Sequence, residues 1–312
     1  MVRDITKLKQ KVGQMQKDES WSMQYTIEQF LQLNHINFIC NYTIAAYTFD
    51  YYCPDFNLTI DLLYVNIQNE QRLSLNMPTR KVKSMLHDKA LFTRSSNIKH
   101  VYIWDYQWYN ERQRAVLQNI ILNYCNKSKT VMARKTYIKV DSAINLKDFF
   151  NVNNIQGYRA AKDAISLYSK DTNELLMSYA IGHAYFGKGK YDIEIIRGAS
   201  KLGYCIVGGA SKLWKYLTTQ YAPSKSIVYY VDLNYYNGKS LDVLCEQYTT
   251  MKLVTSKYSF KNWYVEEQVM RNRDPKHHYE VLKAIEDGLI KTCWDAGSLV
   301  YVYTPYQPLT LY

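Results

Sequence analysis

Two aspartates, Asp50 and Asp61, have the residue type and the spacing needed to hold a divalent cation. They lie on two predicted adjacent strands, Tyr47 to Tyr52 and Leu58 to Val65, joined by a turn that begins at Pro54. Each aspartate is near the middle of its strand, so both carboxylates can point to one site. Carboxylate oxygens are preferred ligands of Mg²⁺, and a bound metal ion can activate water to attack a phosphodiester.

A third carboxylate, Glu28, lies in a segment predicted to be an amphipathic helix. This helix covers Met23 to Leu33, and Glu28 is next to the apolar residue Ile27 at the edge of the buried face. Asp50 and Asp61 are therefore the predicted Mg²⁺ ligands, with Glu28 as an additional acid. Two acidic residues that flank a hairpin are also common as surface charges, and the sequence leaves that alternative open.

The pentapeptide Gly-Ala-Ser-Lys-Leu occurs twice, beginning at Gly198 and at Gly209. The second copy follows an apolar run, Tyr204 to Val207, and precedes a helical segment, 213–217. Glycines at a strand-to-helix turn let the backbone approach an anion, and the start of the helix attracts negative charge. The alternative is a tight turn packed against the sheet. The residues predicted to bind phosphate here and nearby are Arg134, Lys135, Arg197, Lys201, Gly208, Gly209, Ser211, Lys212 and Lys215.

The overall charge favours an anionic partner. The chain has 39 lysines and arginines against 28 acidic residues, a net charge of +11, and it contains 31 tyrosines. Basic and aromatic residues together suit RNA or single-stranded DNA, because lysines bind phosphates and tyrosines stack on bases. An AT-rich coding sequence also enriches tyrosine and lysine, so the tyrosine content alone leaves this open.

Several protein classes are not expected. No apolar run approaches the roughly 18 residues of a membrane-spanning helix, and the first residues lack the apolar core of a secretion signal. The six cysteines are far apart and form no CxxC pair, which is typical of reduced thiols in a cytosolic protein. We expect no membrane contact, and we interpret residues 1–20 as a basic arm.

The element pattern predicts an α/β (α+β) protein with two domains. Residues 21–128 are predicted to form a helix, three strands, a helix, a strand and a helix, and residues 129–312 a mixed sheet with helices. The first predicted strand is Ile36 to Asn41, followed by a break at 43–46, and a late helix is predicted for Tyr279 to Ile290. The remaining predicted strands are 101–104, 137–140, 175–181, 191–196, 227–231 and 299–303, and the remaining helices are 82–89, 112–124 and 143–150.

Residues 47–61 carry the clearest family resemblance. Asp50, Pro54, Leu58 and Ile60 match the motif of phage-type homing endonucleases, which have a Vsr-like, restriction-endonuclease-like core; Asp61 stands where that family usually has Glu. The resemblance implies that Glu28, Asp50, Asp61 and Gln68 would be the catalytic residues of an active Mg²⁺-dependent enzyme. Gln68 takes the place of a histidine, and glutamine cannot transfer a proton in that role. We therefore predict that this nuclease core is weak or dead as a catalyst.

The second half is similar to the acetyltransferase-like fold of the phage Mom DNA-modification proteins. The resemblance to the homing endonucleases continues over Ala133 to Lys135 and both glycine motifs, and the segment that is similar to the Mom fold is a strand that ends at Asp232 and is followed by Gly238. Between these last two residues, Leu233 to Tyr236 replace an Arg-Arg-Trp-Ser sequence of the family. This resemblance implies an acetyltransferase-like domain that has lost residues a transferase would use.

Together these observations favour a phage-encoded nucleic-acid-binding protein derived from a homing endonuclease. Its expected partner is DNA or structured RNA, including ribosomal RNA, and its expected location is the cytoplasm of the infected host cell. No cofactor is expected, except Mg²⁺ if the protein cleaves DNA. Two alternatives remain open at this point: an active Mg²⁺-dependent homing-type endonuclease, and an acyl- or group-transferase that uses the turn from Gly208 to Lys212.

Overall fold

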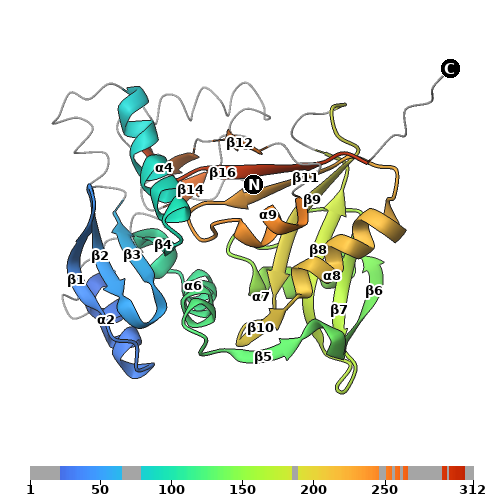
Figure 1. Cartoon of the computed structure of the whole chain (residues 1–312), viewed down its shortest axis with the longest axis horizontal. Helices are drawn as coiled ribbons and strands as arrows, with labels where there is room; N and C mark the ends of the chain where they lie inside the picture. The colour runs from blue at the N-terminus through green and yellow to red at the C-terminus, as the bar shows by residue number, and fades with distance from the viewer. Residues whose placement is uncertain are drawn as a thin grey trace, which may run out of the picture.

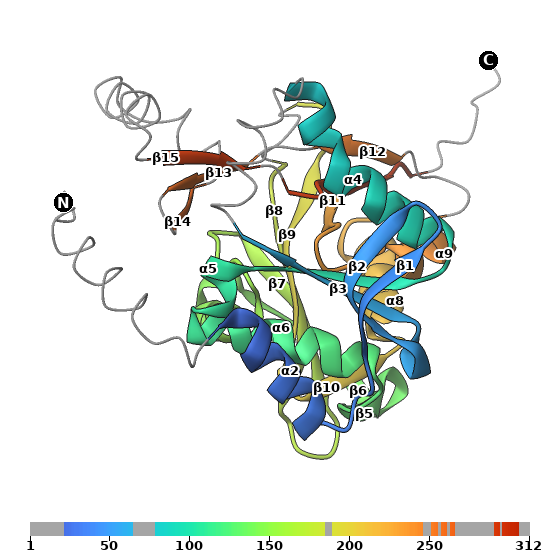
Figure 2. The ribbon, with the colours of Figure 1, turned by 90° about the vertical axis from the view of Figure 1, so that its left-hand side faces the viewer.

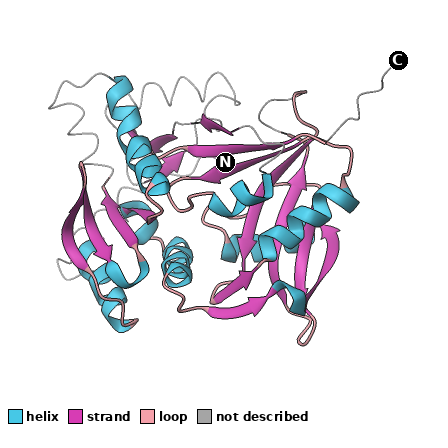
Figure 3. Ribbon diagram, viewed as in Figure 1, coloured by secondary structure: helices cyan, strands magenta, loops and turns pink. Residues whose placement is uncertain are grey.

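The fold consists of two larger sheets with helices packed on both (Figures 1 and 3). The computed structural model describes residues 22–64, 79–184, 189–245, 251–254, 257–260, 263–265, 290–293 and 295–305. Helices and mixed sheets alternate along the chain, so the predicted α/β class is confirmed. None of the helices within these ranges is long and apolar enough to cross a membrane. The predicted basic arm, 1–20, lies outside the described residues.

The first half contains a sheet of four strands in the order β1-β2-β3-β4. The first three strands are antiparallel neighbours, and β4 runs parallel to β3. This agrees with the predicted order of helix, three strands, helix, strand and helix. The elements are α2 (Met23–Leu33), β1 (Ile39–Ile44), β2 (Tyr47–Cys53), η2 (Pro54–Phe56), β3 (Leu58–Leu63), α4 (Thr79–Ser95), β4 (Lys99–Trp104), α5 (Asp105–Trp108) and α6 (Glu111–Tyr124).

The predicted bounds of the first strand were wrong. The prediction ended it at Asn41 with a break at 43–46, whereas β1 continues to Ile44 and the chain turns at Ala45. Asn41 has a positive φ of 50°, and no partner residue is assigned to it, while Tyr42 pairs with Phe49 beyond it. The register is the same on both sides of Asn41, because Cys40 pairs with Tyr51 and Tyr42 with Phe49, so the strand continues past a polar residue that resembles a strand end.

The second half contains a sheet of seven strands in the order β12-β16-β11-β9-β8-β7-β6. Among its pairs, β9 and β11 are parallel, and the connection between them carries β10 and α8. The helical and turn elements are η3 (Ala133–Lys135), η4 (Ala143–Leu146), α7 (Lys147–Asn153), α8 (Gly209–Tyr216), η5 (Leu217–Tyr221) and α9 (Lys239–Cys245). The strands are β5 (Lys129–Met132), β6 (Thr136–Ser142), β7 (Asp163–Ser169), β8 (Leu175–Gly182), β9 (Ile193–Ser200), β10 (Tyr204–Val207), β11 (Ile227–Asp232), β12 (Met251–Val254), β13 (Lys257–Phe260), β14 (Trp263–Val265), β15 (Ile290–Cys293) and β16 (Ser298–Tyr303).

The predicted helix at 279–290 lies outside the described residues except for its last residue. Ile290 begins the strand β15, which pairs with β13. Strand β7 was not predicted, although it lies between β6 and β8 in the larger sheet. Its residues Asp163 to Ser169 are mostly buried on both faces of the sheet, so they lack the clean alternation by which a half-buried strand is recognised.

The two sheets contribute residues to each other's hydrophobic cores. Tyr235, from the segment after β11, packs into the first core, whereas Ala90 and Tyr102 of the first half pack into the second. The backbone N–H of Tyr102 also donates to the carbonyl of Asn234 at 2.8 Å. Helix α4 lies between the two sheets (Figure 2). The sheets are thus held in contact by shared apolar burial; the division into two domains at 128–129 stays a prediction.

Candidate functional site

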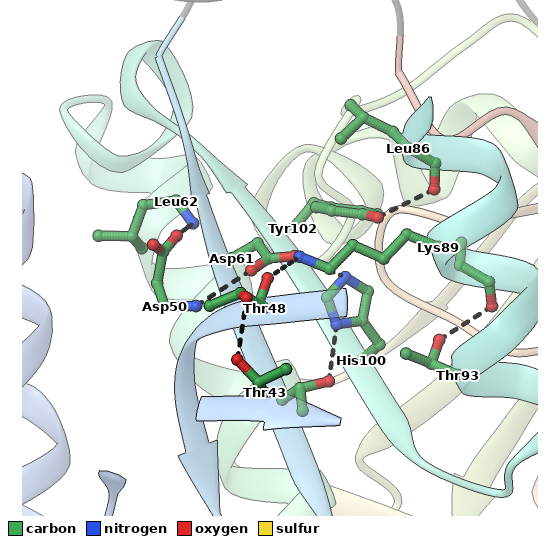
Figure 4. Close-up of polar contacts among 12 residues, drawn as sticks. Thr43, Thr48, Asp50, Asp61, Leu62, Leu86, Lys89, Thr93, His100 and Tyr102 are labelled. Atoms are coloured by element: carbon green, nitrogen blue, oxygen red, sulfur yellow. Dashed lines mark hydrogen bonds and ion pairs between the residues drawn. The ribbon is translucent and has the colours of Figure 1, made fainter. Parts of the chain in front are cut away.

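Asp50 and Asp61 come together where β2 and β3 separate. The last assigned backbone pair between these strands is Tyr51 with Ile60. Beyond it, the N–H of Asp50 donates to Oδ1 of Asp61 at 3.2 Å, and the N–H of Leu62 donates to Oδ2 of Asp50 at 2.6 Å (Figure 4). Each carboxylate therefore accepts a backbone hydrogen bond from the opposite strand. These two hydrogen bonds connect β2 and β3 beyond their last backbone pair.

Lys89 of α4 supplies the positive charge beside Asp61. Its ammonium forms an ion pair with Oδ2 of Asp61, and both side chains are largely buried, at 14% and 7% exposed. The same ammonium donates to the carbonyl of Thr48 at 2.6 Å and lies 4.2 Å from the ring centroid of Phe49. Lys89 is therefore held by a carboxylate, a carbonyl and an aromatic face at once; Figure 4 shows its ammonium beside Asp61.

His100 of β4 completes the group, which we call the carboxylate cluster: Asp50, Asp61, Lys89 and His100. Its Nε2 atom is 3.6 Å from Oδ2 of Asp61, and its Nδ1 atom is hydrogen-bonded to Oγ1 of Thr59 at 2.8 Å. Burial, and then the nearby charge of Lys89, lower the pKa of His100 well below its ordinary value. The imidazole is therefore neutral at neutral pH, and Lys89 is the cation of the cluster.

Burial also acts on Asp61, in the opposite sense. Burial raises the pKa of Asp61 to about 6, the Lys89 charge offsets part of this effect, and the Asp50 charge adds to it. A buried carboxylate loses its hydration, which favours the protonated form. Asp61 therefore gains or loses its proton near pH 6, about two units above an ordinary aspartate.

Glu28 does not join the two aspartates as a third ligand. Its Oε1 accepts hydrogen bonds from the Tyr51 hydroxyl at 3.0 Å and from Gln24 at 3.1 Å. In the described part of the chain, no three His, Cys, Asp or Glu side chains are placed to hold a metal ion together. Gln68, the fourth predicted catalytic residue, lies outside the described residues.

The donor set of the cluster does not fit Mg²⁺. Oδ2 of Asp61 already holds the ammonium of Lys89, so a divalent cation would have to displace a lysine that three groups fix in place. Mg²⁺ dehydrates reluctantly and needs near-octahedral oxygen ligands. The Asp61 carboxylate is instead neutralised by the ammonium of Lys89, which lies where a metal ion would have to bind.

Sequence reasoning did not select Lys89 or His100 as partners of Asp61. A charged residue on a strand that is buried on both faces requires a counter-charge, and that signal was available. The partner depends on the parallel pairing of β3 with β4, which puts Thr59 opposite His100 and Asp61 opposite Tyr102. It depends equally on the packing of α4 over this sheet, and neither contact follows from local pattern.

The second predicted site, at Gly208 and Gly209, has the expected order of strand, turn and helix. Gly208 follows β10 with a φ of 76°, a left-handed conformation that favours glycine. A Cβ on Gly209 would lie 2.8 Å from Cγ2 of Ile206 and 2.8 Å from Sδ of Met177. Both glycines are thus required by backbone conformation and by the close packing of α8, whether or not an anion binds.

Lys212 points into the protein rather than to the turn's outer side. Its ammonium donates to the carbonyls of Ala133 at 2.9 Å and of Thr136 at 2.5 Å, and to Oγ1 of Thr136 at 3.2 Å. It therefore joins α8 to η3. Of the other predicted phosphate-binding residues, Ser211 and Lys215 are exposed on α8.

The remaining predicted phosphate-binding residues differ in how they are held. Arg134 and Lys135 are exposed on η3. Arg197 donates to the carbonyls of Gly157 at 3.1 Å and Ile196 at 2.8 Å, and Lys201 forms an ion pair with Glu174. Lys212, Arg197 and Lys201 therefore have protein partners, whereas Arg134, Lys135 and Lys215 present basic groups to solvent.

Comparison with models of known protein families finds no match, and comparison with curated protein sequences finds none either. The resemblance of residues 47–61 to homing endonucleases therefore rests on the motif alone.

Proposed function

We propose that the protein binds nucleic acid, either DNA or structured RNA, and that its carboxylate cluster stabilises the fold instead of cleaving phosphodiesters. The observation that carries the proposal is the net charge of +11. Such an excess attracts a polyanion, and phosphate contacts supply most of the affinity of non-specific nucleic-acid binding. The setting we propose is the host cytoplasm during phage infection, where ribosomal RNA is one available partner.

The exposed basic residues around η3 and α8 support this proposal. Arg134, Lys135 and Lys215 are exposed, and Lys212 ties the two elements together. Because the backbone that carries them is fixed, these side chains can contact successive phosphates with little rearrangement.

The carboxylate cluster supports the second part of the proposal. Asp61 is paired with Lys89, and His100 is neutral and buried. Because Lys89 already holds the Asp61 carboxylate, that carboxylate is not available to a metal ion, and His100 is buried away from any water that it could activate.

Binding is tested by fluorescence anisotropy with labelled duplex DNA, structured RNA and single strands. We expect affinity to fall by about a hundredfold between about 50 and about 200 mM salt, because several condensed counterions are released. The variant in which Arg134, Lys135 and Lys215 are all replaced by Gln should bind more weakly and with a smaller salt slope, since each lost phosphate contact reduces the slope by about one. No binding to any nucleic acid at low salt would refute the proposal.

Cleavage is tested separately by incubating plasmid and phage genomic DNA with the protein and Mg²⁺ or Mn²⁺. We expect no cut product from the wild type. Cleavage that disappears in the Asp50→Ala variant would show that the cluster is catalytic, and would replace this part of the proposal by a metal-dependent endonuclease.

A further inference from the structure

A group of tyrosines and lysines surrounds the turn between β7 and β8. Tyr137 of β6 stacks on Tyr168 of β7, with ring centroids 5.7 Å apart and planes at 22°. The ammonium of Lys139 lies 5.6 Å from the ring centroid of Tyr168. Two stacked rings with a cation over one of them form an aromatic surface with a positive edge.

Tyr204 of β10 is also joined to this turn, through its hydroxyl bond to Glu174, and it has cations near its ring. The ammonium groups of Lys129 and Lys201 lie 5.2 Å and 5.4 Å from its ring centroid. We call the six residues Lys129, Tyr137, Lys139, Tyr168, Lys201 and Tyr204 the tyrosine–lysine strip. Strands β5, β10, β6 and β7, which carry five of its residues, lie along the bottom and lower right of Figure 1.

The hydroxyl of each tyrosine in the strip is bonded to the protein. Tyr204 donates to Oε2 of Glu174 at 3.1 Å, Tyr168 donates to Oδ2 of Asp141 at 3.1 Å, and Tyr137 donates to Oδ1 of Asn173. Glu174 and Asn173 both belong to the β7–β8 turn. Because a bond at the ring edge fixes the ring plane, the ring faces are oriented in advance, which lowers the entropy cost of binding.

The strip is accessible from solvent. Tyr137 is 37% exposed and the side chain of Lys139 is 55% exposed. Strand β6 is the last strand at this end of the seven-stranded sheet. The rings of Tyr137 and Tyr168 therefore lie at this edge of the sheet, with Tyr137 exposed and Tyr168 and Tyr204 half-buried.

The charge around the strip favours an anionic partner. Lys170 of the β7–β8 turn donates its backbone N–H to the carbonyl of Lys135 at 2.9 Å, so the exposed basic residues of η3 continue from this turn. Three acids also lie here: Asp141 pairs with Lys139 at 2.7 Å, Glu174 pairs with Lys201, and Asp171 is exposed in the turn. Phosphate oxygens can compete for the exposed ammonium groups without disturbing the ring positions.

We propose that the tyrosine–lysine strip binds single-stranded nucleic acid, with bases stacked on the tyrosines and phosphates on the lysines. Stacking on aromatic rings needs unpaired bases, because in a duplex the base faces are covered by their neighbours. RNA and single-stranded DNA share this chemistry. This inference rests on the proposed nucleic-acid binding and identifies the form of nucleic acid that this surface takes.

The experiment is fluorescence anisotropy of the full-length protein with oligouridylate, oligothymidylate and a DNA duplex, each about 12 nucleotides long. Tyr137→Ala and Tyr204→Ala should each weaken single-strand binding at least about fivefold, the lower end of one lost base-stacking contact. Binding of the duplex should stay within about twofold of wild type. The relative affinity for oligouridylate and oligothymidylate tells RNA from DNA.

Two further variants keep the result interpretable. Tyr137→Phe retains the ring but loses its hydroxyl bond to Asn173, so it should bind single strands more tightly than Tyr137→Ala and no more tightly than wild type. Tyr25→Ala removes a tyrosine that is 53% exposed on α2, in the other half of the chain, and should bind like wild type. Thermal melting checks that each variant is folded. If the wild type binds single strands and both alanine variants bind them equally well, or if they weaken duplex binding equally, this inference is overturned. If the wild type binds no nucleic acid, the proposed function itself fails.

Discussion

Asp61 shows how burial and charge act together on one side chain. Its carboxylate accepts the N–H of Asp50, pairs with Lys89 and lies beside a neutral histidine. Burying an ion pair costs hydration that the pairing only partly returns, so a buried pair is weak evidence for stability. The raised pKa of Asp61 expresses this cost, because the charged carboxylate is less favourable inside the protein than in water.

The raised pKa leads to a pH dependence of stability. Since the pKa of Asp61 is about 6 in the folded protein and lower in the unfolded chain, the folded state holds an extra proton between about pH 4 and 6. The stabilisation of the folded state by this proton is complete below about pH 4 and is lost as the pH rises through 6. Relative to Asp61→Asn, which does not titrate, the wild type should lose on the order of 2–3 kcal/mol of unfolding free energy across this window.

Urea unfolding of both proteins at several pH values measures this difference. Lys89→Met removes the cation that lowers the pKa of Asp61, so its window should extend to higher pH. A stability difference between wild type and Asp61→Asn that is the same at pH 4 and pH 7 would contradict the assignment.

At the scale of the element, α8 is positioned by interactions on two sides. Gly209 lets its first turn approach Ile206 and Met177, while Lys212 bonds the carbonyls of Ala133 and Thr136. The turn at Gly208 and Gly209, which resembles a phosphate-binding turn, therefore also allows α8 to pack closely against its neighbours. The lysine of the motif serves the protein's own carbonyls, and exposed Lys215 is the lysine on this helix that faces solvent.

These two lysines provide a matched pair of variants. Lys212→Met keeps the aliphatic chain but leaves two carbonyls without their charged donor, so it should lower the unfolding free energy by about 2–3 kcal/mol. Lys215→Met should change it by less than about 0.5 kcal/mol, because its ammonium is exposed. Urea unfolding monitored by circular dichroism measures both. Equal effects of the two variants would mean that Lys212 does not anchor α8.

At the scale of the whole molecule, α4 connects the two sheets. Lys89 forms an ion pair with Asp61 of the first sheet. On the other side, His87 is hydrogen-bonded through Nδ1 to the carbonyl of Ala296 at 2.7 Å, and Arg94 donates to both carboxylate oxygens of Asp242 in α9. Asp242 also accepts a bond from the hydroxyl of Tyr301 in β16. With residues exchanged between the cores, the described parts of the two halves should unfold together.

Hydrogen exchange tests this coupling. We expect amides of β3 and β8 to exchange with the same free energy of opening, because neither sheet keeps a closed core without the other. Arg94→Met should lower both values by about 1–2 kcal/mol, since it removes the ion pair to Asp242. Arg114→Met, whose guanidinium contacts the Trp108 carbonyl within the first half at 3.5 Å, serves as the control. Protection lost in β3 alone would show that the halves open independently.

Local features of the fold were predictable where the chain itself determines them. The hairpin around Pro54, the amphipathic helix at Met23–Leu33 and the strand, turn and helix around Gly208 follow from turn chemistry and periodicity. The continuation of β1 past Asn41 and the strand β7 were missed. The first depends on pairing with Phe49 and its neighbours, and the second is buried on both faces. The approach of Lys89 and His100 to Asp61 was missed because it depends on contacts between distant segments.

The repeated pentapeptide separates what the sequence determined from what only the tertiary structure decided. Sequence alone determined the charge of +11, the paired aspartates and the glycines that permit close approach. It could not decide the structure of Gly-Ala-Ser-Lys-Leu, whose first copy ends β9 and whose second begins α8. At Gly198, the pairing with Tyr179 and the close approach of the Tyr229 hydroxyl favour a strand. At Gly209, the packing against Ile206 favours a helix. Identical residues have identical local preferences, so burial against different neighbours made the difference.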